Sequence, residues 1–198
     1  PSSAAFLIAI GLLKSKKVVI KNVLLNERRI GFLKVLKRMN ADILLENIEN
    51  FQNEPVGDIV VKKSKLQGVT VDGSDVVDMV DEIPIFTLLA SQAEGVTKVI
   101  GAQELRLKES DRLAAMENFI NELDGEITTF EDGFEINGKQ NLQSGVVETL
   151  EDHRIAMTAV VANICIDSQI KADNIDCISD SYPDFFYDLE KIGANYES

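Results

Sequence analysis

The residues best suited to chemistry lie in the segment LRLKESDRLAAM (105–116), where five of the seven residues from 106 to 112 are charged. Apolar residues recur at spacings of three and four from position 113 onward, which predicts an amphipathic helix over 109–123. Lys108 and Glu109 stand four and three positions before Arg112, near a helix start, where backbone N–H groups point outward. Such a cluster can hold an anion and move a proton. The alternative is a solvated helix start with weak ion pairs.

A second candidate is Asp152-His153-Arg154, which contains the only histidine of the chain. It opens the segment DHRIAMTAVVANICI, which is apolar almost all the way round and therefore predicts a buried helix. Asp152 is placed to cap this helix, and Arg154 falls in its first turn. Because a capped helix start with one arginine is also structurally ordinary, this segment alone leaves a functional role open.

Five motifs resemble the 5-enolpyruvylshikimate-3-phosphate synthase family, in the order of that family's C-terminal half. They are PSSAAF (1–6), VDEIP (80–84), RLKESDRL (106–113), DHRIAM (152–157) and SYPDFF (181–186). The resemblance implies an α/β (α+β) enolpyruvyl transferase fold, an inverse α/β barrel-like domain of three repeated βαβαββ units with buried inner helices. It also implies a second domain, with the active site in the cleft between the two.

The activity implied by this resemblance is that of 3-phosphoshikimate 1-carboxyvinyltransferase, in the shikimate pathway to chorismate and the aromatic amino acids. The enolpyruvyl group of phosphoenolpyruvate passes to the 5-hydroxyl of shikimate 3-phosphate through a tetrahedral intermediate, and phosphate is released. This reaction needs a base, an acid and cations that hold phosphate and carboxylate groups. Neither a metal nor another cofactor is expected.

The resemblance also implies roles for individual residues. Arg112 and Arg154 are expected to clamp phosphoenolpyruvate, since arginine offers the bidentate geometry that lysine lacks. Asp81, 28 positions before Glu109, is expected to contact the acceptor hydroxyl, although from its own surroundings it is equally well a plain helix cap. Glu109 is the second proton-transfer residue, and Lys108 is expected to touch both substrates. Which of these groups donates the proton is left open.

One position departs from the family's pattern. Some members carry a lysine that reaches the donor phosphate shortly before the SYPDFF-like motif, and this chain has Asp180 there. A carboxylate cannot clamp phosphate, so Asp180 is not expected in the site. Asp152 and His153 are expected to order Arg154 rather than to react.

Composition narrows the class of protein. The chain has 198 residues, of which 45% are hydrophobic, and a formal net charge of −13. This charge argues against nucleic acid as a partner and means that an anionic substrate needs a local concentration of cations.

No apolar run reaches the roughly 18 residues of a membrane span. The apolar N-terminus lacks a basic region before it, so we expect a core helix rather than a signal peptide. Cys165 and Cys177 show no metal spacing, and we expect them to be reduced in a cytoplasmic protein.

Taken in order, the pattern predicts a buried helix, a strand, an amphipathic helix and two strands, repeated at about 70 residues. The expected copies cover about 1–66, 82–138 and 152–198. The first comprises a helix from Ser2 to near Gly11, a strand at 17–20, a helix at 28–39 and strands at 41–45 and 58–62, with 46–57 as a turn. The second comprises a helix at 82–93 interrupted by Pro84, a strand at 97–100, the helix at 109–123 and strands at 126–130 and 134–136. The third has a helix from Arg154, a strand at 169–172 and a helix at 183–192.

The sequence starts at a proline, which suggests that it begins within a longer protein. We expect residues 1–198 to form a single C-terminal domain that folds at least partly alone but turns over substrate poorly or not at all without its N-terminal domain. Two other functions stay open. One is the sister transferase that uses UDP-N-acetylglucosamine and a reactive cysteine, a setting that neither cysteine here provides. The other is a non-catalytic binding or scaffold domain, against which the two arginine-bearing helix starts argue.

Overall fold

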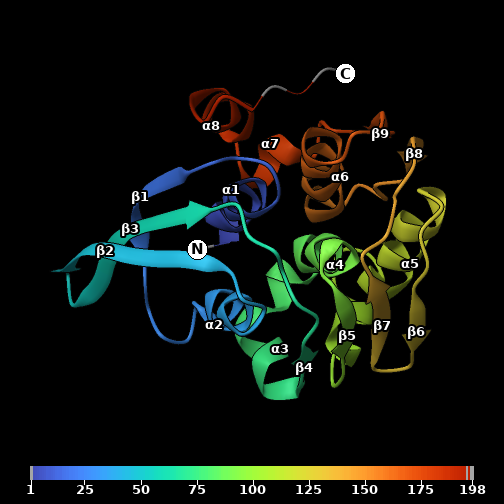
Figure 1. Cartoon of the computed structure of the whole chain (residues 1–198), viewed down its shortest axis with the longest axis horizontal. Coiled ribbons are helices and arrows are strands. Elements are labelled where there is room, and N and C mark those ends of the chain that lie inside the picture. The colour runs from blue at the N-terminus through green and yellow to red at the C-terminus, as the bar shows by residue number, and fades with distance from the viewer. Residues whose placement is uncertain (1, 195, 197–198) are drawn as a thin grey trace.

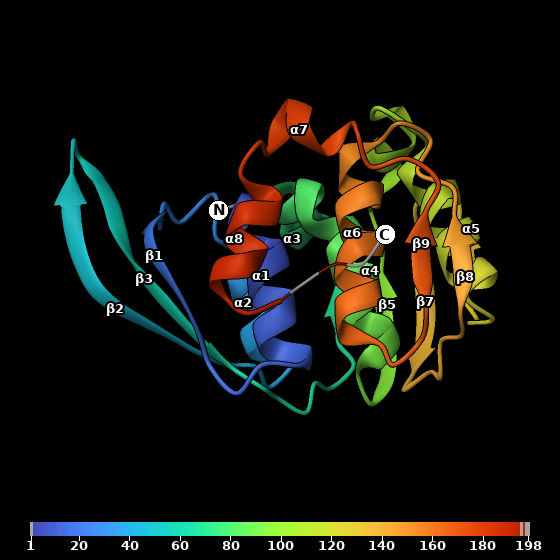
Figure 2. The same ribbon diagram turned by 90° about the horizontal axis from the view of Figure 1, so that it is seen from above.

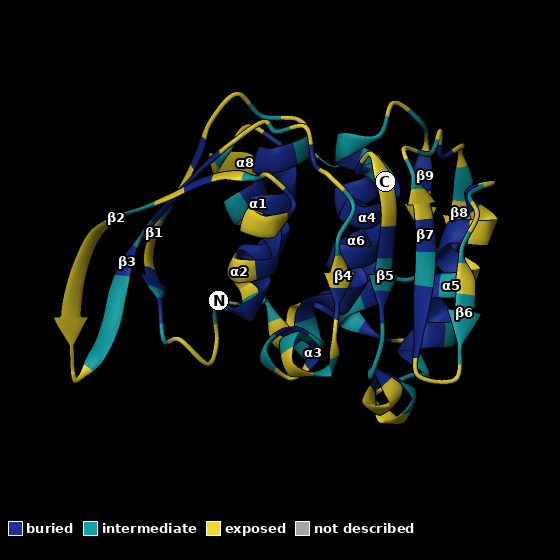
Figure 3. Ribbon diagram, turned by 60° about the horizontal axis from the view of Figure 1, so that its bottom comes forward, coloured by how far each residue is buried: buried dark blue, intermediate teal, exposed yellow. Residues whose placement is uncertain are grey.

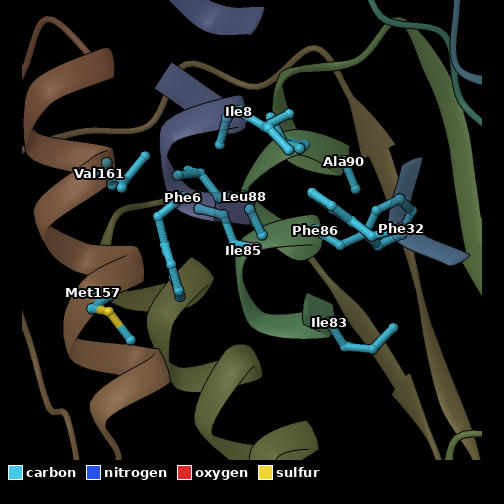
Figure 4. Packing of buried hydrophobic residues seen from close by; sticks show 14 of the residues in the cluster. Phe6, Ile8, Phe32, Ile83, Ile85, Phe86, Leu88, Ala90, Met157 and Val161 are labelled. Atoms are coloured by element: carbon cyan, nitrogen blue, oxygen red, sulfur yellow. The ribbon is translucent and has the colours of Figure 1, made fainter. Parts of the chain in front are cut away.

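Three apolar helices form the centre of the computed structural model, which describes residues 2–194 and 196. They are α1 (Ser2–Leu13), α4 (Ile83–Gln92) and α6 (His153–Cys165), and each packs against the other two (Figure 1). Nearly every residue of these helices is buried. Figure 4 shows Phe6 of α1 lying between α6 and the apolar side chains of α4. Because α1, α4 and α6 are apolar on all sides, burying every side of each helix removes most of their surface from water.

Strands lie on both sides of this helical centre (Figure 2). One sheet has the order β1-β3-β2 and is antiparallel; another has the order β4-β5-β7-β6, in which β4 and β5 are parallel; β8 and β9 form a parallel pair. The strands are β1 (Val18–Leu24), β2 (Asp42–Phe51), β3 (Glu54–Lys62), β4 (Thr70–Val71), β5 (Gly95–Val99), β6 (Thr128–Phe130), β7 (Gly133–Gly138), β8 (Gly145–Val147) and β9 (Ile170–Ala172).

The remaining helices cover the outside. Helices α2, α5 and α8 bury one face and expose the other (Figure 3), as their mixed sequences predict. Short helical segments link the longer elements. The outer and short helices are α2 (Gly31–Arg38), α3 (Gly73–Met79), α5 (Arg112–Glu122), α7 (Ile178–Ser181), α8 (Phe185–Lys191) and the 3-10 turns η1 (Val80–Glu82) and η2 (Gln103–Leu107).

The three inner helices begin at the same end of the molecule, the end that carries α3 and α7 in Figure 2. Side-chain contacts confirm this convergence. Glu82, just before α4, lines the same small cavity as Ser2 at the start of α1. Its neighbour Asp81 is ion-paired with Arg154 in the first turn of α6. The fold therefore gathers three helix starts in one place.

Most predicted elements exist, but several boundaries were wrong. Helix α1 continues past Gly11 to Leu13, because Gly11 serves packing: an added Cβ would lie 2.9 Å from a Val61 methyl. Pro84 does not interrupt α4 but lies in its first turn, where no backbone N–H is needed. Helix α2 begins at Gly31 instead of position 28.

The largest error concerns residues 46–57, which were predicted to turn the chain. They instead extend β2 and β3 into a long hairpin, and only Gln52 and Asn53 form the turn. Both residues have positive φ, 49° and 66°, which is the requirement of a tight hairpin turn. Pro55 lies within β3 and is paired with Asn50, so a proline in this sheet does not end a strand.

Similar orders of helices and strands recur along the chain. α1 is followed by β1, α2, β2 and β3; α4 by β5, α5, β6 and β7; α6 by β9, α7 and α8. The repeat boundaries expected from the sequence stay a prediction. Pro1 of the first motif lies outside the described residues.

Candidate active site

Arg112 is the first residue of α5, three positions later than the helix start expected from the sequence. Asp111 fixes this start, since its side chain accepts a hydrogen bond from the Ala114 N–H and receives an ion pair from Arg106 at 2.9 Å. Lys108 and Glu109 therefore precede the helix rather than lying on it. Arg112 is only 1% exposed, which makes it the largest fully buried side chain in the described part of the molecule.

The guanidinium of Arg112 contacts three carboxylates. Its Nε lies 2.9 Å from Oδ2 of Asp152, its Nη2 lies 2.7 Å from Oε2 of Glu109, and its Nη1 lies 3.4 Å from Oδ1 of Asp81. These partners come from three separate segments of the chain. Burial of a charge is costly unless such partners are present, so Arg112 ties the segments together.

Asp152 is the innermost of these carboxylates and is fully buried. It caps α6 by accepting the Arg154 backbone N–H at 2.9 Å, and it also accepts a hydrogen bond from Ser110 Oγ at 3.0 Å. Burial pushes the pKa of Asp152 up, but hydrogen bonding to Arg112 and the charge of that residue oppose it, and the net pKa is lowered. Asp152 is therefore an ionised anchor. Asp152 was expected to order Arg154. It holds that residue through the backbone N–H, whereas its main side-chain partner is Arg112.

Asp81 and Glu109 lie at the outer edge of this network. Their side chains are 42% and 54% exposed, respectively. Asp81 lies in η1 and bridges the two arginines, with its Oδ2 3.5 Å from Arg154 Nη2. It makes no capping hydrogen bond for α4, so the plain helix-cap alternative for Asp81 is wrong. Both carboxylates are reachable from solvent while they contact a guanidinium.

Four of the five predicted site residues are thus joined by ion pairs: Asp81, Glu109, Arg112 and Arg154. Lys108 is partly buried and makes no ion pair or side-chain hydrogen bond within 2–194 and 196. Its position beside Glu109 in the chain keeps it near the network, with an ammonium group not engaged by another described residue.

Other titratable groups fit the network differently. His153 is the first residue of α6, and burial together with the Arg154 charge lowers its pKa, which favours a neutral imidazole. Asp180 is exposed on α7. Cys165 ends α6, away from the helix starts, and burial raises its pKa to about 12. A thiol with such a pKa is a poor nucleophile at neutral pH.

Sequence reasoning missed Ser110 and Glu82. Ser110 supports Asp152, and nothing in its sequence setting marks that role, because its partner lies 42 positions away. Glu82 is buried, and burial raises its pKa. It lines a cavity of about 180 Å³ with its neighbour Asp81 and with Arg28 and Arg29. The sequence feature that could have identified Glu82 is the acidic pair in VDEIP, of which the prediction used only Asp81.

The arrangement combines anion binding with proton transfer. Arginine in a buried setting offers paired N–H donors to a phosphate or carboxylate, and exposed carboxylates beside it can accept or return a proton. No group of three or more His, Cys, Asp or Glu side chains among the described residues is arranged to hold a metal ion. No helix in the described ranges has the length and apolar character needed to cross a membrane.

Comparison with known proteins identifies the family of the chain. The family model for EPSP synthase (3-phosphoshikimate 1-carboxyvinyltransferase) matches residues 1–189. The 3-phosphoshikimate 1-carboxyvinyltransferase of Endomicrobium trichonymphae is 45% identical over 194 residues, which are 96% of this chain and 45% of that protein. The enzyme of the same name from Aquifex aeolicus is 41% identical, over 97% of this chain and 45% of its own. The chain thus spans about half the length of these curated relatives.

Solved structures lead to the same family. The structure of EPSP synthase from Acinetobacter baumannii superposes with a TM-score of 0.94 at 33% identity, over 99% of this chain and 46% of that one. The enolpyruvyl transferase NikO from Streptomyces tendae has a TM-score of 0.77 at 16% identity, covering 99% of this chain and 43% of its own, and supports the fold alone. The enolpyruvyl transferase fold expected from the motifs is therefore confirmed, and the chain belongs to the EPSP synthase family.

Proposed function

We propose that this chain is the C-terminal domain of a two-domain cytoplasmic enzyme that transfers the enolpyruvyl group of phosphoenolpyruvate to the 5-hydroxyl of shikimate 3-phosphate. The observation that carries the proposal is the network in which Arg112 and Arg154 share Asp81, with Glu109 beside them. Family membership and relatives of about twice this length support the second domain. The absence of a membrane-crossing helix from the described ranges fits the location.

In this mechanism Arg112 and Arg154 bind the anionic groups of phosphoenolpyruvate. An exposed carboxylate, Asp81 or Glu109, takes the proton of the acceptor hydroxyl as its oxygen attacks C2 of the donor. A proton is delivered to the methylene carbon, which gives the tetrahedral intermediate. Loss of a proton from the new methyl group and departure of phosphate then restore the double bond. Asp81, Glu109 and Lys108 share the proton transfers among them.

A binding role for Arg154 can be tested with Arg154→Lys in the complete enzyme, because this side chain is more accessible than buried Arg112. Lysine keeps the charge but loses the paired donors, so affinity for phosphoenolpyruvate should fall about tenfold or more, as expected for a lost hydrogen bond between charged groups. Arg38→Lys is the matched control, since Arg38 pairs with Asp75 outside the network. Equal donor affinity in both variants would contradict the clamp.

The two-domain proposal predicts that this chain alone releases little or no phosphate from phosphoenolpyruvate and shikimate 3-phosphate. Adding the N-terminal half should restore release, and UDP-N-acetylglucosamine should not replace the shikimate acceptor. Circular dichroism of both halves is the folding control. No release in the mixture, with both halves folded, would favour a non-catalytic relative.

A further inference from the structure

The hairpin formed by β2 and β3 has a tip that extends beyond the pairing of β1 with β3, which ends at Leu24 and Val56. We call residues 46–57 the arm; it projects away from the helical centre in Figures 1 and 2. Strand β2 is an edge strand of the sheet β1-β3-β2. Every residue of β2 from Glu46 to Phe51 is exposed. On the β3 side of the arm, Glu54, Pro55 and Val56 are partly covered and Gly57 is buried, so the uncovered part of the arm is its β2 strand.

Two large apolar side chains are on this uncovered strand. Ile48 is 57% exposed and Phe51 is 64% exposed. A long exposed edge strand with apolar side chains tends to associate with other chains unless something covers it. The bulge between Glu46 and Glu49 interrupts the pairing of β2 with β3. Such a bulge twists an edge strand and so protects it against unspecific pairing, but Ile48 and Phe51 stay exposed.

The arm points toward the end of the molecule that carries the candidate active site. In Figure 2 its tip extends toward the end at which α3 and α7 lie, and Figure 3 shows the same exposed tip reaching toward the level of α3. Those elements flank the starts of the inner helices, where Asp81 and Arg154 meet. A body that covers the site from this side comes within reach of the arm.

The charge of the arm indicates which partner fits it best. The arm contains Glu46, Glu49 and Glu54 and has no lysine or arginine. A second copy of this chain is disfavoured by its own net charge of −13. The other domain of the proposed enzyme differs, because it faces two anionic substrates while the two arginines here already meet three carboxylates. A domain that binds two anions carries cations on the face turned toward this one, and an acidic arm is complementary to such a face.

We propose that the arm docks on the N-terminal domain of the same enzyme, with Ile48 and Phe51 packed against that domain and the arm's glutamates facing its cations. This inference rests on the proposed function for the existence of that domain. It makes the arm an interdomain contact that lies away from the reacting groups.

Photo-crosslinking of the complete enzyme tests this contact. Phe51→p-benzoylphenylalanine places the probe on the arm, and Val146→p-benzoylphenylalanine on β8, where Val146 is 55% exposed, is the matched control. An equal mixture of ¹⁵N-labelled and unlabelled protein separates contacts within one chain from contacts between copies. The expected result is crosslinks from position 51 to N-terminal-half peptides of the same chain, and none from position 146. Crosslinks between copies, or none from position 51, would overturn the proposal.

A double substitution measures what the contact contributes. Ile48→Ser with Phe51→Ser should raise the KM for substrate about tenfold, the typical cost of removing central apolar contacts from an interface, while Val146→Ser should leave it unchanged. Unchanged KM in the double variant would also overturn the proposal. Because crosslinking needs no turnover, an inactive but crosslinked enzyme refutes the proposed function alone, and an active enzyme without crosslinks refutes the arm alone.

Discussion

The cationic side chains at the two ends of the inner helices α1, α4 and α6 differ in their burial and in their ion pairing. At the starting end, Arg112 is buried and Arg154 is largely covered, and both are ion-paired. At the other end, the exposed residues Lys63, Lys65 and Lys139 line a cavity of about 610 Å³, far larger than the 180 Å³ cavity beside Asp81. The larger cavity therefore lies at the end away from the candidate site. Buried, ion-paired arginines mark a constructed site, whereas exposed lysines at helix C-termini offset the negative end of the helix dipole.

The largest expected effect comes from Asp152→Ala, which would leave the buried Arg112 without its inner partner. Removing one member of a buried ion pair costs about 3–5 kcal/mol of unfolding free energy. Urea denaturation of this chain and of the variant measures this loss. Asp152→Asn is the control, because asparagine still caps α6 while it loses the charge. A loss of unfolding free energy below about 1 kcal/mol in the alanine variant would mean that the starting end tolerates replacement of a charged side chain as well as the other end does.

A second test uses the opposite pKa shifts at the starting end. Asp152 has a pKa below its ordinary 3.8, so its contribution to stability is present above that value and is lost as pH falls through the lower folded pKa. Glu82 has a pKa above its ordinary 4.5, so its contribution is full below that value and is lost as pH rises through the folded pKa.

Glu82→Gln should therefore gain unfolding free energy relative to the wild type as the pH rises above 4.5, the ordinary pKa of a glutamate, because the glutamine side chain never ionises. The control is Glu117→Gln on α5, whose carboxylate has a partner, Thr129, outside the network. Parallel pH profiles for the wild type and Glu82→Gln would contradict the assignment of a raised pKa to this buried carboxyl.

A smaller effect is expected for Ser110→Ala. It removes one hydrogen bond to Asp152 at 3.0 Å and should cost about 1 kcal/mol of unfolding free energy. Ser179→Ala, which removes a hydroxyl on the exposed helix α7, is the control. Indistinguishable midpoints in urea would show that Arg112 holds Asp152 without the serine.

The smallest effects should follow replacement of Lys63, Lys65 and Lys139 by glutamine. Each exposed substitution should change the unfolding free energy by no more than about 0.5 kcal/mol. A loss of several kcal/mol would remove the contrast between the two ends, because it would give the lysines a structural role like that of Arg112.

Sequence patterns predicted the inner helices well, because uninterrupted apolar segments such as AAFLIAIGLL (4–13) leave no other arrangement open, and Asp152 was identified as the cap of α6. They failed where long-range pairing decides the structure. Strand β8 pairs with β9, 25 positions later, and Pro55 and Gly57 resembled turn residues until their cross-strand partners were known. Helix α3 was also missed, although Asp72 and Asp75 form a capping box at its start.

For the candidate site, residue types and motif order identified the charged groups, but not their depth. Nothing near Arg112 in the sequence reveals that it is buried, since Asp152 follows 40 positions later. Whether a charged helix start is wet or enclosed depends on which distant segment meets it. The arm was missed for the same reason, because its pairing partners lie across the hairpin and, for Val56 and Gly57, on β1.

The shared direction of α1, α4 and α6 has an electrostatic consequence of its own. Each helix start carries about half a positive charge from its aligned peptide dipoles, so three starts together place roughly one and a half positive charges beside a network whose two guanidiniums and three carboxylates sum to one negative charge. This backbone field has no pKa and cannot be removed by replacing a side chain. An anion that approaches this end of an acidic molecule therefore meets a permanent attraction set by the direction of the helices.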